Sequence, residues 1–222
     1  MKKELKKVTT KDGSETFYSD EYQEYYHSIS GAMEEAFKKF AIPGIKPKLK
    51  KKSIRILHIC FGLGYLSAAA IHYIRKNNAK MDVDIIGLEI DQAILDKISE
   101  IEVPNLIKPD YELIRGLAHN KWELHLGRFH LKMIKGDARH TINDLEGGFD
   151  VVFLDPFSPK KCPELWTQKF IKKIYDLMNK KGILTTYSCA RSVRNNLEAV
   201  GFKVKDGPRV GRRAPSTIAQ KT

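Results

Sequence analysis

The segment Ile54–Tyr65 places the tightest constraint on the fold. It reads Ile-Arg-Ile-Leu-His-Ile-Cys-Phe-Gly-Leu-Gly-Tyr, and its isoleucine-rich beginning predicts a buried strand over 54–60. Gly62 and Gly64 then predict a turn into a helix over 65–77. Strand, glycine turn and helix form the entry to a nucleotide-binding α/β fold, because glycines let the backbone approach a ligand and the first helical turn has unpaired N–H groups. The third glycine of the dinucleotide fingerprint is missing, which argues against a pyrophosphate cofactor.

Acidic residues follow three further predicted strands. Glu89 ends the second strand, about as far from the glycine turn as the ribose-binding acid of doubly wound folds. Asp137 and Ala138 follow the third strand, where the acid can accept a hydrogen bond from an adenine amino group, and Asp155 ends the fourth. Ligands bind at the carboxyl ends of such strands. A Gly-x-Gly turn and acids in this order are typical of Rossmann-like methyltransferases, so we expect S-adenosylmethionine as the cofactor.

Strands and helices alternate from residue 54 onward. This alternation predicts an α/β fold with a mostly parallel seven-stranded sheet and helices on both faces. We expect an N-terminal aromatic and helical segment with a lysine-rich linker over 1–52, and a methyltransferase domain over 53–222 with an insert at about 101–128. The predicted strands are 54–60, 83–88, 129–135, 150–155, 183–188, 202–205 and 216–220. The predicted helices are 65–77, 91–100, 111–121, 139–146, 162–180 and 190–200.

The N-terminal segment is rich in aromatic residues. Residues 17–28 hold four tyrosines, a phenylalanine and a histidine. They either pack against the main domain or form a lid that stacks on a base or covers the cofactor. Helical spacing of apolar residues follows over 31–40, and Pro43 is expected to break that helix before five lysines lead into the first core strand.

Composition narrows the partners and the compartment. The formal net charge of +12 over 222 residues favours a polyanion such as RNA, although a lysine-rich host proteome is the alternative. The three cysteines have no metal-type spacing, so no metal is expected. No apolar run approaches the ~18 residues that a membrane span needs, and the N-terminus lacks the apolar core of a signal peptide. We therefore expect a cytoplasmic protein that does not enter the membrane.

The segment after the fourth strand resembles the methyltransferase domain of the MnmC family of bacterial tRNA-modifying enzymes. It reads Leu-Asp-Pro-Phe-Ser-Pro-Lys-Lys-Cys-Pro-Glu-Leu-Trp-Thr over 154–167, where the family has an Asp-x-Phe-x-Pro-x-Lys-x-Pro-x-x-Trp-Thr pattern. Pro156 departs from the family, which often has a small residue there, but leaves Asp155 in place. Similar segments lie at 25–28, 31–35, 61–65, 182–190, 193–197, 201–204 and 211–213.

The resemblance implies methylation of the amine of 5-aminomethyl(-2-thio)uridine at the tRNA wobble position. Bifunctional MnmC proteins also carry an FAD oxidase, for which this chain is too short, so we expect only the methyltransferase activity and a separate enzyme that supplies the aminomethyl intermediate. Asp155 is the expected catalytic residue, because an alkyl amine has a pKa of about 10 and must lose a proton before it can be methylated. The expected cofactor-binding residues are Tyr26, Gly31, Gly62, Gly64, Tyr65, Glu89, Asp137 and Ala138. The expected substrate-binding residues are Phe157, near the uracil, and Lys160, Lys161, Arg191, Arg194, Arg212 and Arg213, at phosphates.

Two other functions stay open at this point. A polyamine aminopropyltransferase, or another small-amine N-methyltransferase, has a similar fold, and the aminopropyltransferases share the aromatic N-terminal segment and an acid after the fourth strand. The basic composition and the Trp166-Thr167 match speak against it. A non-catalytic RNA-binding module is the second alternative, and the intact Gly62, Gly64, Glu89 and Asp155 speak against it.

Overall fold

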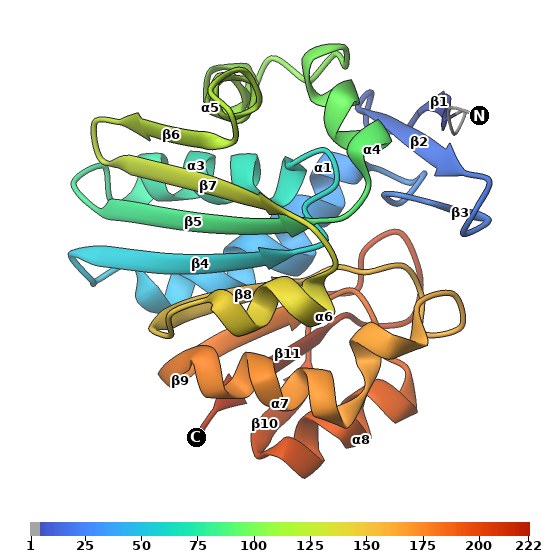
Figure 1. The fold of residues 1–222 in the computed structure, drawn as a ribbon, viewed down its shortest axis with the longest axis vertical. Helices are drawn as coiled ribbons and strands as arrows, with labels where there is room; N and C mark the ends of the chain where they lie inside the picture. Colours follow the sequence, from blue (N-terminus) through green and yellow to red (C-terminus); the bar gives the residue numbers. More distant parts are fainter. Residues whose placement is uncertain (1–4) are drawn as a thin grey trace.

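An eight-stranded sheet forms the centre of the protein. The structure is a computed structural model that describes residues 5–222. The strand order is β10-β11-β9-β8-β4-β5-β7-β6, and the five strands from β9 to β7 are parallel (Figure 1). The strands are β4 (Ser53–Ile59), β5 (Asp82–Glu89), β6 (Glu123–Leu126), β7 (Phe129–Lys135), β8 (Phe149–Leu154), β9 (Met178–Thr186), β10 (Phe202–Asp206) and β11 (Thr217–Lys221). The predicted Rossmann-like fold is confirmed.

The prediction of seven strands is wrong by one edge strand. β6 lies in the predicted insert, where Glu-Leu-His-Leu alternates over only four residues. It pairs antiparallel with β7 through a turn at Gly127, whose φ of 58° is left-handed. A four-residue alternation at an exposed edge gives little hydrophobic signal, which is why it escaped prediction. The last two predicted strands form an antiparallel pair, with β11 between β9 and β10.

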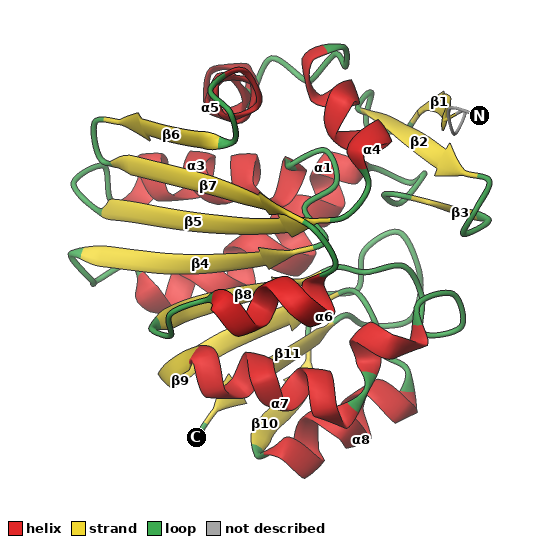
Figure 2. Cartoon of the chain, viewed as in Figure 1, coloured by secondary structure: helices red, strands yellow, loops and turns green. Residues whose placement is uncertain are grey.

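Helices cover both faces of the sheet (Figure 2). One apolar cluster joins one face to the helices that come early in the chain, and a second joins the other face to the later ones. The first set is α1 (Ala32–Glu35), α2 (Ile42–Ile45), α3 (Tyr65–Asn77), α4 (Gln92–Asp96) and α5 (Lys108–His119), and the second is α6 (Ala138–Thr141), α7 (Gln168–Leu177) and α8 (Arg191–Val200). None of the helices within residues 5–222 has the length and apolar character to cross a membrane.

Pro43 does not break the N-terminal helix as predicted. The chain runs without leaving helical geometry from α1 through a π-helical turn at Ala36–Ala41 into α2 and a 3₁₀ turn at Lys46–Lys48. Pro43 lies just after the π-helical turn, and packing on the core holds the chain helical across it. Buried residues of this path, such as Phe40 and Ile45, belong to the same cluster as α3. The division of the chain at residue 52 stays a prediction.

The single helix predicted over 162–180 is interrupted. Its beginning is a 3₁₀ turn at Pro163–Trp166, and Thr167 then takes an extended conformation and caps α7 by accepting a hydrogen bond from the N–H of Phe170 at 3.2 Å. Its last residues, from Met178, belong to β9. The extended cap explains the interruption. A threonine hydroxyl can accept a hydrogen bond from a backbone N–H that is unpaired at the start of a helix, so threonine is favoured at an N-cap and not inside a helix.

The lysine run before β4 lies at the amino ends of the parallel strands. Lys51 pairs with Asp150 at 2.5 Å, and the ammonium of Lys48 donates to the carbonyl of Lys181 at 2.6 Å. These partners sit at the starts of β8 and β9. Because ligands of such sheets bind at the carboxyl ends, this run is placed on the far side from a nucleotide site.

The antiparallel strands β1 (Leu5–Thr9), β2 (Glu15–Ser19) and β3 (Glu24–Tyr25) form a separate small sheet. Figure 1 shows this small sheet beside the carboxyl ends of β4 and β5. The predicted aromatic segment thus begins in β2 and passes over the end of the large sheet where a ligand is expected.

Two buried histidines make stability depend on pH. Burial lowers the pKa of His27 to about 4 and that of His58 to about 3, from an ordinary 6.5. Below pH 6.5 the unfolded chain therefore gains these protons while the folded protein does not. As the pH is lowered through this window, the free energy of unfolding decreases by about 1.4 kcal/mol per pH unit for each histidine.

We expect His58→Leu to reduce this dependence. Denaturant unfolding between pH 6 and 4.5 should give a slope of stability against pH that is smaller by about 1.4 kcal/mol per unit than in the wild type. His119→Gln, at an exposed position, is the control and should keep the wild-type slope. Equal slopes for all three proteins would contradict the buried, neutral state of His58.

Candidate active site

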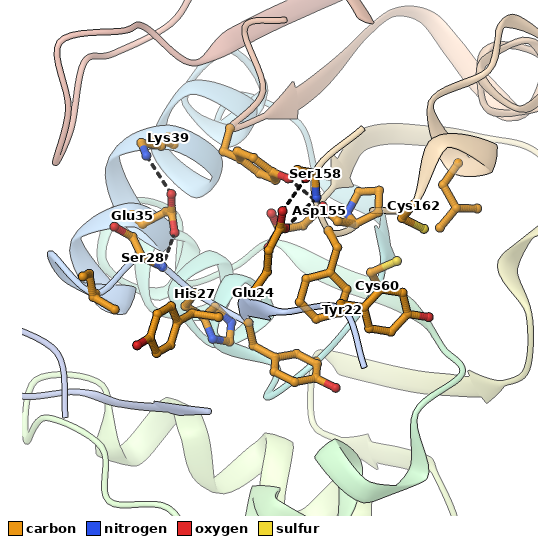
Figure 3. A pocket seen from close by; sticks show the side chains of 18 of the residues that line it. Tyr22, Glu24, His27, Ser28, Glu35, Lys39, Cys60, Asp155, Ser158 and Cys162 are labelled. Carbon is orange, nitrogen blue, oxygen red and sulfur yellow. Dashed lines mark hydrogen bonds and ion pairs between the residues drawn. The ribbon is translucent and has the colours of Figure 1, made fainter. Parts of the chain in front are cut away.

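A cavity of about 380 Å³ opens at the carboxyl ends of β4, β5 and β8. This volume lies in the range of small-molecule sites. The cavity lies between the strand ends, the N-terminal segment and the loop before β11, and several of its side chains are drawn in Figure 3. Its walls include Tyr22, Glu24, Tyr26, His27, Ser28, Glu35, Lys39, Cys60, Gly62, Glu89, Asp91, Asp155, Phe157, Ser158, Cys162, Tyr187 and Arg212.

The two glycines of the turn have different tasks. At Gly64, with φ 77°, an added Cβ would lie 2.6 Å from the Ile114 side chain, so the absence of a side chain serves packing. At Gly62, with φ 53°, an added Cβ would meet no protein atom closer than 3.8 Å. Gly62 also lines the cavity, so the bare space beside it is available to a ligand.

Glu89 fixes the junction of β4 and β5. Its carboxylate accepts hydrogen bonds from the backbone N–H groups of Gly62, Ile90 and Asp91, all at 2.8 Å. The side chain is buried, and burial raises its pKa, while the three N–H groups oppose that rise because they favour the charged form. The predicted ribose-binding acid is thus held at the cavity wall in a fixed orientation.

Asp91 and Tyr26 join the N-terminal segment to the end of β5. Asp91 caps α4 by accepting from the N–H of Ala93 at 2.9 Å, and its second oxygen accepts from the hydroxyl of Tyr26 at 2.7 Å. Burial and this hydrogen bond raise the pKa of Tyr26 far above its ordinary value, so its hydroxyl stays protonated and donates. Tyr26 lines the cavity as part of its cover, at the position predicted for a closing residue.

Asp155 follows β8 and reaches the cavity opposite an ion pair (Figure 3). Burial raises its pKa well above the usual range, with the neighbouring Glu35 adding to the rise and Lys39 opposing it. Glu35 and Lys39 pair at 2.6 Å with both side chains buried, and Glu35 also accepts from the N–H of Ser28 at 2.9 Å. A carboxylate with a raised pKa is a better proton acceptor than an ordinary aspartate.

The loop after β8 is tied to the N-terminal segment. The ring of Phe157 stacks on Tyr22 at 4.4 Å and meets Tyr26 edge-on at 5.0 Å. The carboxylate of Glu24 accepts hydrogen bonds from the backbone N–H and the hydroxyl of Ser158 (Figure 3). The aromatic segment packs on the main domain, as one of the two predictions expected, and it also lines the cavity. A lid over a base or the cofactor stays a prediction.

Five of the predicted cofactor-binding residues do not line the cavity, and Gly64, which serves packing, is one of them. Tyr65 is fully buried, and its hydroxyl donates to the carbonyl of Glu15 at 2.7 Å. Gly31 faces Asp12, whose carboxyl would lie 2.6 Å from an added Cβ. Asp137 caps α6 and pairs with Arg139, which lowers its pKa, and Ala138 is buried beside it. Their roles toward a cofactor stay predictions.

The predicted phosphate-contacting residues fall into two groups. Arg212 lines the cavity, with its guanidinium over the ring of Tyr187 and donating to the Tyr187 carbonyl. Lys160, Lys161, Arg191 and Arg213 are exposed, and Lys161 donates to the Gln23 side chain at 3.1 Å. Arg194 instead pairs with Asp206 at 2.7 Å and donates to Thr217 at 3.0 Å, which ties α8 to the strands β10 and β11.

Sequence reasoning missed several cavity residues. Glu24, Glu35 and Lys39 were not predicted, although Glu24 lies among the aromatic residues and Glu35 and Lys39 have the spacing of a helical ion pair. Only the folded chain shows that this pair is buried and faces Asp155. The sequence did contain a signal, because Glu35 is an acid within the apolar helical pattern of residues 31–40.

Comparison with known families agrees with this geometry. A sequence profile of a family described as S-adenosyl-L-methionine-dependent methyltransferase matches residues 104–222. This is more than half of the 222 residues. The chain belongs to this methyltransferase family.

The methyltransferase is similar to a solved structure of MnmC2 from Aquifex aeolicus. The two are 36% identical with a TM-score of 0.86, over 98% of this chain and 70% of that chain. An uncharacterized protein of Methanocaldococcus jannaschii is 33% identical over 100% of this chain. The bifunctional tRNA 5-methylaminomethyl-2-thiouridine biosynthesis protein MnmC of Leptospira interrogans is 27% identical over 70% of this chain. The resemblance to MnmC methyltransferase domains and the expected cofactor are thereby confirmed.

The methyltransferase spans only part of these curated relatives. It covers 61% of the Methanocaldococcus protein and 23% of the Leptospira protein. What those longer proteins do as a whole is therefore not transferred to this chain by similarity.

The open space beside Gly62 predicts that a side chain at this position weakens cofactor binding. Gly62→Ala should cost about 1 kcal/mol of stability through its positive φ, and should weaken S-adenosylmethionine binding at least tenfold because the new methyl group enters the ligand space. Calorimetric titration measures the binding.

Gly127→Ala is the matched control for this change. Gly127 has a similar φ of 58° and nothing within 4 Å of an added Cβ, but lies in the β6–β7 turn. It should show the same loss of stability with wild-type cofactor affinity. Equal cofactor affinity in the two variants would show that the space at Gly62 is not used.

The bond between Tyr26 and Asp91 gives a second prediction. Tyr26→Phe removes one hydrogen bond from the cover of the cavity and should weaken S-adenosylmethionine binding about 3–10-fold, the effect of roughly 1 kcal/mol. Tyr175→Phe, which loses a hydroxyl contact with Thr222 outside the cavity, should leave binding unchanged. If Tyr26→Phe binds the cofactor as the wild type does, the cover does not contribute to cofactor binding.

Proposed function

We propose that this methyltransferase methylates the amine of 5-aminomethyl(-2-thio)uridine at the wobble position of tRNA, giving 5-methylaminomethyl(-2-thio)uridine. The observation that carries the proposal is the shielded Asp155 in a cavity whose other acids are Glu24, Glu35, Glu89 and Asp91. Such a cavity suits a cationic amine. The similar MnmC protein of Leptospira is named for the biosynthesis of the same modified nucleoside, which supports the choice of substrate.

The residues present fit the cofactor. The bare space at Gly62 and the fixed carboxylate of Glu89 would hold S-adenosylmethionine at the ends of β4 and β5. When bound, the cofactor supplies an activated methyl group on a sulfonium. The protein contributes binding and alignment, which for two oriented reactants removes much of the barrier.

Asp155 prepares the amine for the reaction. A primary alkyl amine has a pKa of about 10 and arrives as an ammonium without a free lone pair. The Asp155 carboxylate binds this ammonium and accepts one of its protons, which frees the nitrogen lone pair. The raised pKa of Asp155 favours this transfer, and the buried Glu35–Lys39 pair beside it adds little net charge to the site.

Phe157 provides the surface for the uracil ring. It already forms part of an aromatic group with Tyr22 and Tyr26 next to Asp155. A base that is unstacked from the anticodon loop can stack on such a group, and this is how proteins read single-stranded RNA bases. The amine on the base would then reach Asp155, which follows β8 as Phe157 does.

The basic side chains outside the cavity suit the tRNA backbone. Arg212 lies at the cavity, and Lys160, Arg191 and Arg213 are exposed. With a net charge of +12, the protein would attract phosphates over a long range. The proposal places the enzyme in the cytoplasm, where a separate enzyme would supply the aminomethyl intermediate.

The role of Asp155 can be tested with a conservative variant. Asp155→Asn should lower methyl transfer by about 10²–10⁴-fold, because an amide cannot accept the proton, while cofactor affinity stays within threefold. Asp144→Asn, at an exposed acid, is the control. Near-normal turnover of Asp155→Asn would refute the assigned role.

The substrate can be tested with labelled S-adenosylmethionine and tRNA from cells that lack the modification. Label in 5-methylaminomethyl(-2-thio)uridine on nucleoside analysis supports the proposal. Transfer of aminopropyl groups from the decarboxylated cofactor to polyamines would instead favour the aminopropyltransferase alternative. Oxidative removal of a carboxymethyl group by the pure protein would contradict a methyltransferase-only function.

A further inference from the structure

A histidine-rich cluster lies on the β6–β7 hairpin, away from the catalytic cavity. His125 of β6 and His130 of β7 face each other directly across the antiparallel pair. Glu123 lies two residues before His125 and therefore projects from the same face of the sheet. The strand register therefore makes two imidazoles and one carboxylate neighbours, whatever rotamers their side chains adopt.

The ligand atoms of these three side chains lie close together. They fall within 4.8 Å of one another. The Nε2 atoms of His130 and His125 lie 3.2 Å and 3.5 Å from Oε1 of Glu123. The two imidazole rings are stacked, with their centroids 4.0 Å apart. Rotation of these side chains would bring the three ligand atoms to the 2.0–2.2 Å bonds of a zinc ion.

A second carboxylate, that of Asp84, lies at the other ring nitrogen of His130. Asp84 of β5 is the register partner of His130, and its Oδ1 lies 2.8 Å from Nδ1 of that ring. Asp84 is itself held by Arg55 of β4, whose Nε donates to Oδ2 at 2.6 Å. A carboxylate at one ring nitrogen leaves the other nitrogen free for a metal, and this arrangement is common around metal-binding histidines.

The nearby ammonium of Lys132 leaves the cluster accessible to a metal ion. The ammonium of Lys132 lies 3.6 Å from Oε2, and Oε1 remains directed at the histidines. Imidazole nitrogens favour zinc and its neighbours, whereas Mg²⁺ and Ca²⁺ prefer oxygen ligands.

We propose that Glu123, His125 and His130 bind one Zn²⁺ ion, with Asp84 as the orienting partner of His130. The ion joins the edge strand β6 to β7 and, through Asp84, to β5. Its fourth ligand is water, because the site is exposed. The inference does not depend on the proposed function, and the ion stabilises the hairpin without taking part in methyl transfer.

Metal binding is measured on the full chain without a histidine tag. Titration with Zn²⁺ against a chromogenic chelator should give one site with a Kd of about 10 µM or tighter, and Co²⁺ should give the visible absorption of a bound ion. The thermal midpoint should rise by about 3–6 °C at a free zinc concentration ten times the Kd. Chelation should reverse this rise. No binding, or binding only at millimolar zinc, would overturn the proposal.

Variants separate this site from non-specific binding. His125→Ala and His130→Ala should each weaken zinc binding more than thirtyfold, and Asp84→Asn should weaken it about tenfold. His119→Ala, an exposed histidine outside the cluster, is the matched control and should bind like the wild type. Circular dichroism confirms that each variant folds. Wild-type affinity in the His125→Ala or His130→Ala protein would assign the metal to another place, and wild-type affinity in Asp84→Asn would remove Asp84 from the site.

Discussion

The carboxylate of Glu89 holds together the edge of the sheet on which the site depends. It binds three backbone N–H groups, one in the glycine turn after β4 and two directly after β5. A charged acceptor makes these bonds stronger than neutral ones, and their fixed positions leave the carboxylate little freedom. The turn that is proposed to admit the cofactor is therefore oriented by the same acid that is expected to bind its ribose. Loss of that group would leave three buried donors without partners and would loosen both strand ends.

The cover of the cavity comes from segments far apart in the sequence. Tyr26 reaches Asp91, and Glu24 reaches Ser158, so the N-terminal segment spans the ends of β5 and β8. On its other side, Gly211 lies so close to Ser30 that an added Cβ would be 2.0 Å from its hydroxyl. The two halves of the cover thus meet above the same strand ends. The active site is assembled only when the N-terminal segment and the last loop pack on the sheet, which makes cofactor binding a sensitive report on their docking.

The sequence was sufficient wherever a local pattern determines a local structure. The strand, glycine turn and helix at Ile54–Tyr65 and the acids Glu89 and Asp155 occur at the strand ends where they were predicted. It was insufficient where packing decides between alternatives. Pro43 is a helix breaker in isolation, yet the chain stays helical across it because the segment packs on the core. Asp137 ends a strand as predicted, but pairs with Arg139 two residues later, a choice that depends on side-chain orientation.

The cavity is richer in acids than the chain as a whole, and this contrast would let the proposed enzyme attract both the phosphates and the amine of its tRNA substrate. The chain as a whole carries +12, but the cavity holds Glu24, Glu35, Glu89, Asp91 and Asp155 against Lys39 and Arg212. An RNA phosphate is repelled by such a cavity and attracted by the surface around it, whereas an ammonium has the opposite preference. The field of the protein would therefore orient an aminomethyl nucleotide before any specific contact forms. A neutral side group on the same base would lose the attraction to Asp155, and a carboxymethyl group on the amine would add an anion that the acids of the cavity repel. Discrimination between precursor and substrate would therefore follow from charge at the place where the methyl group is transferred.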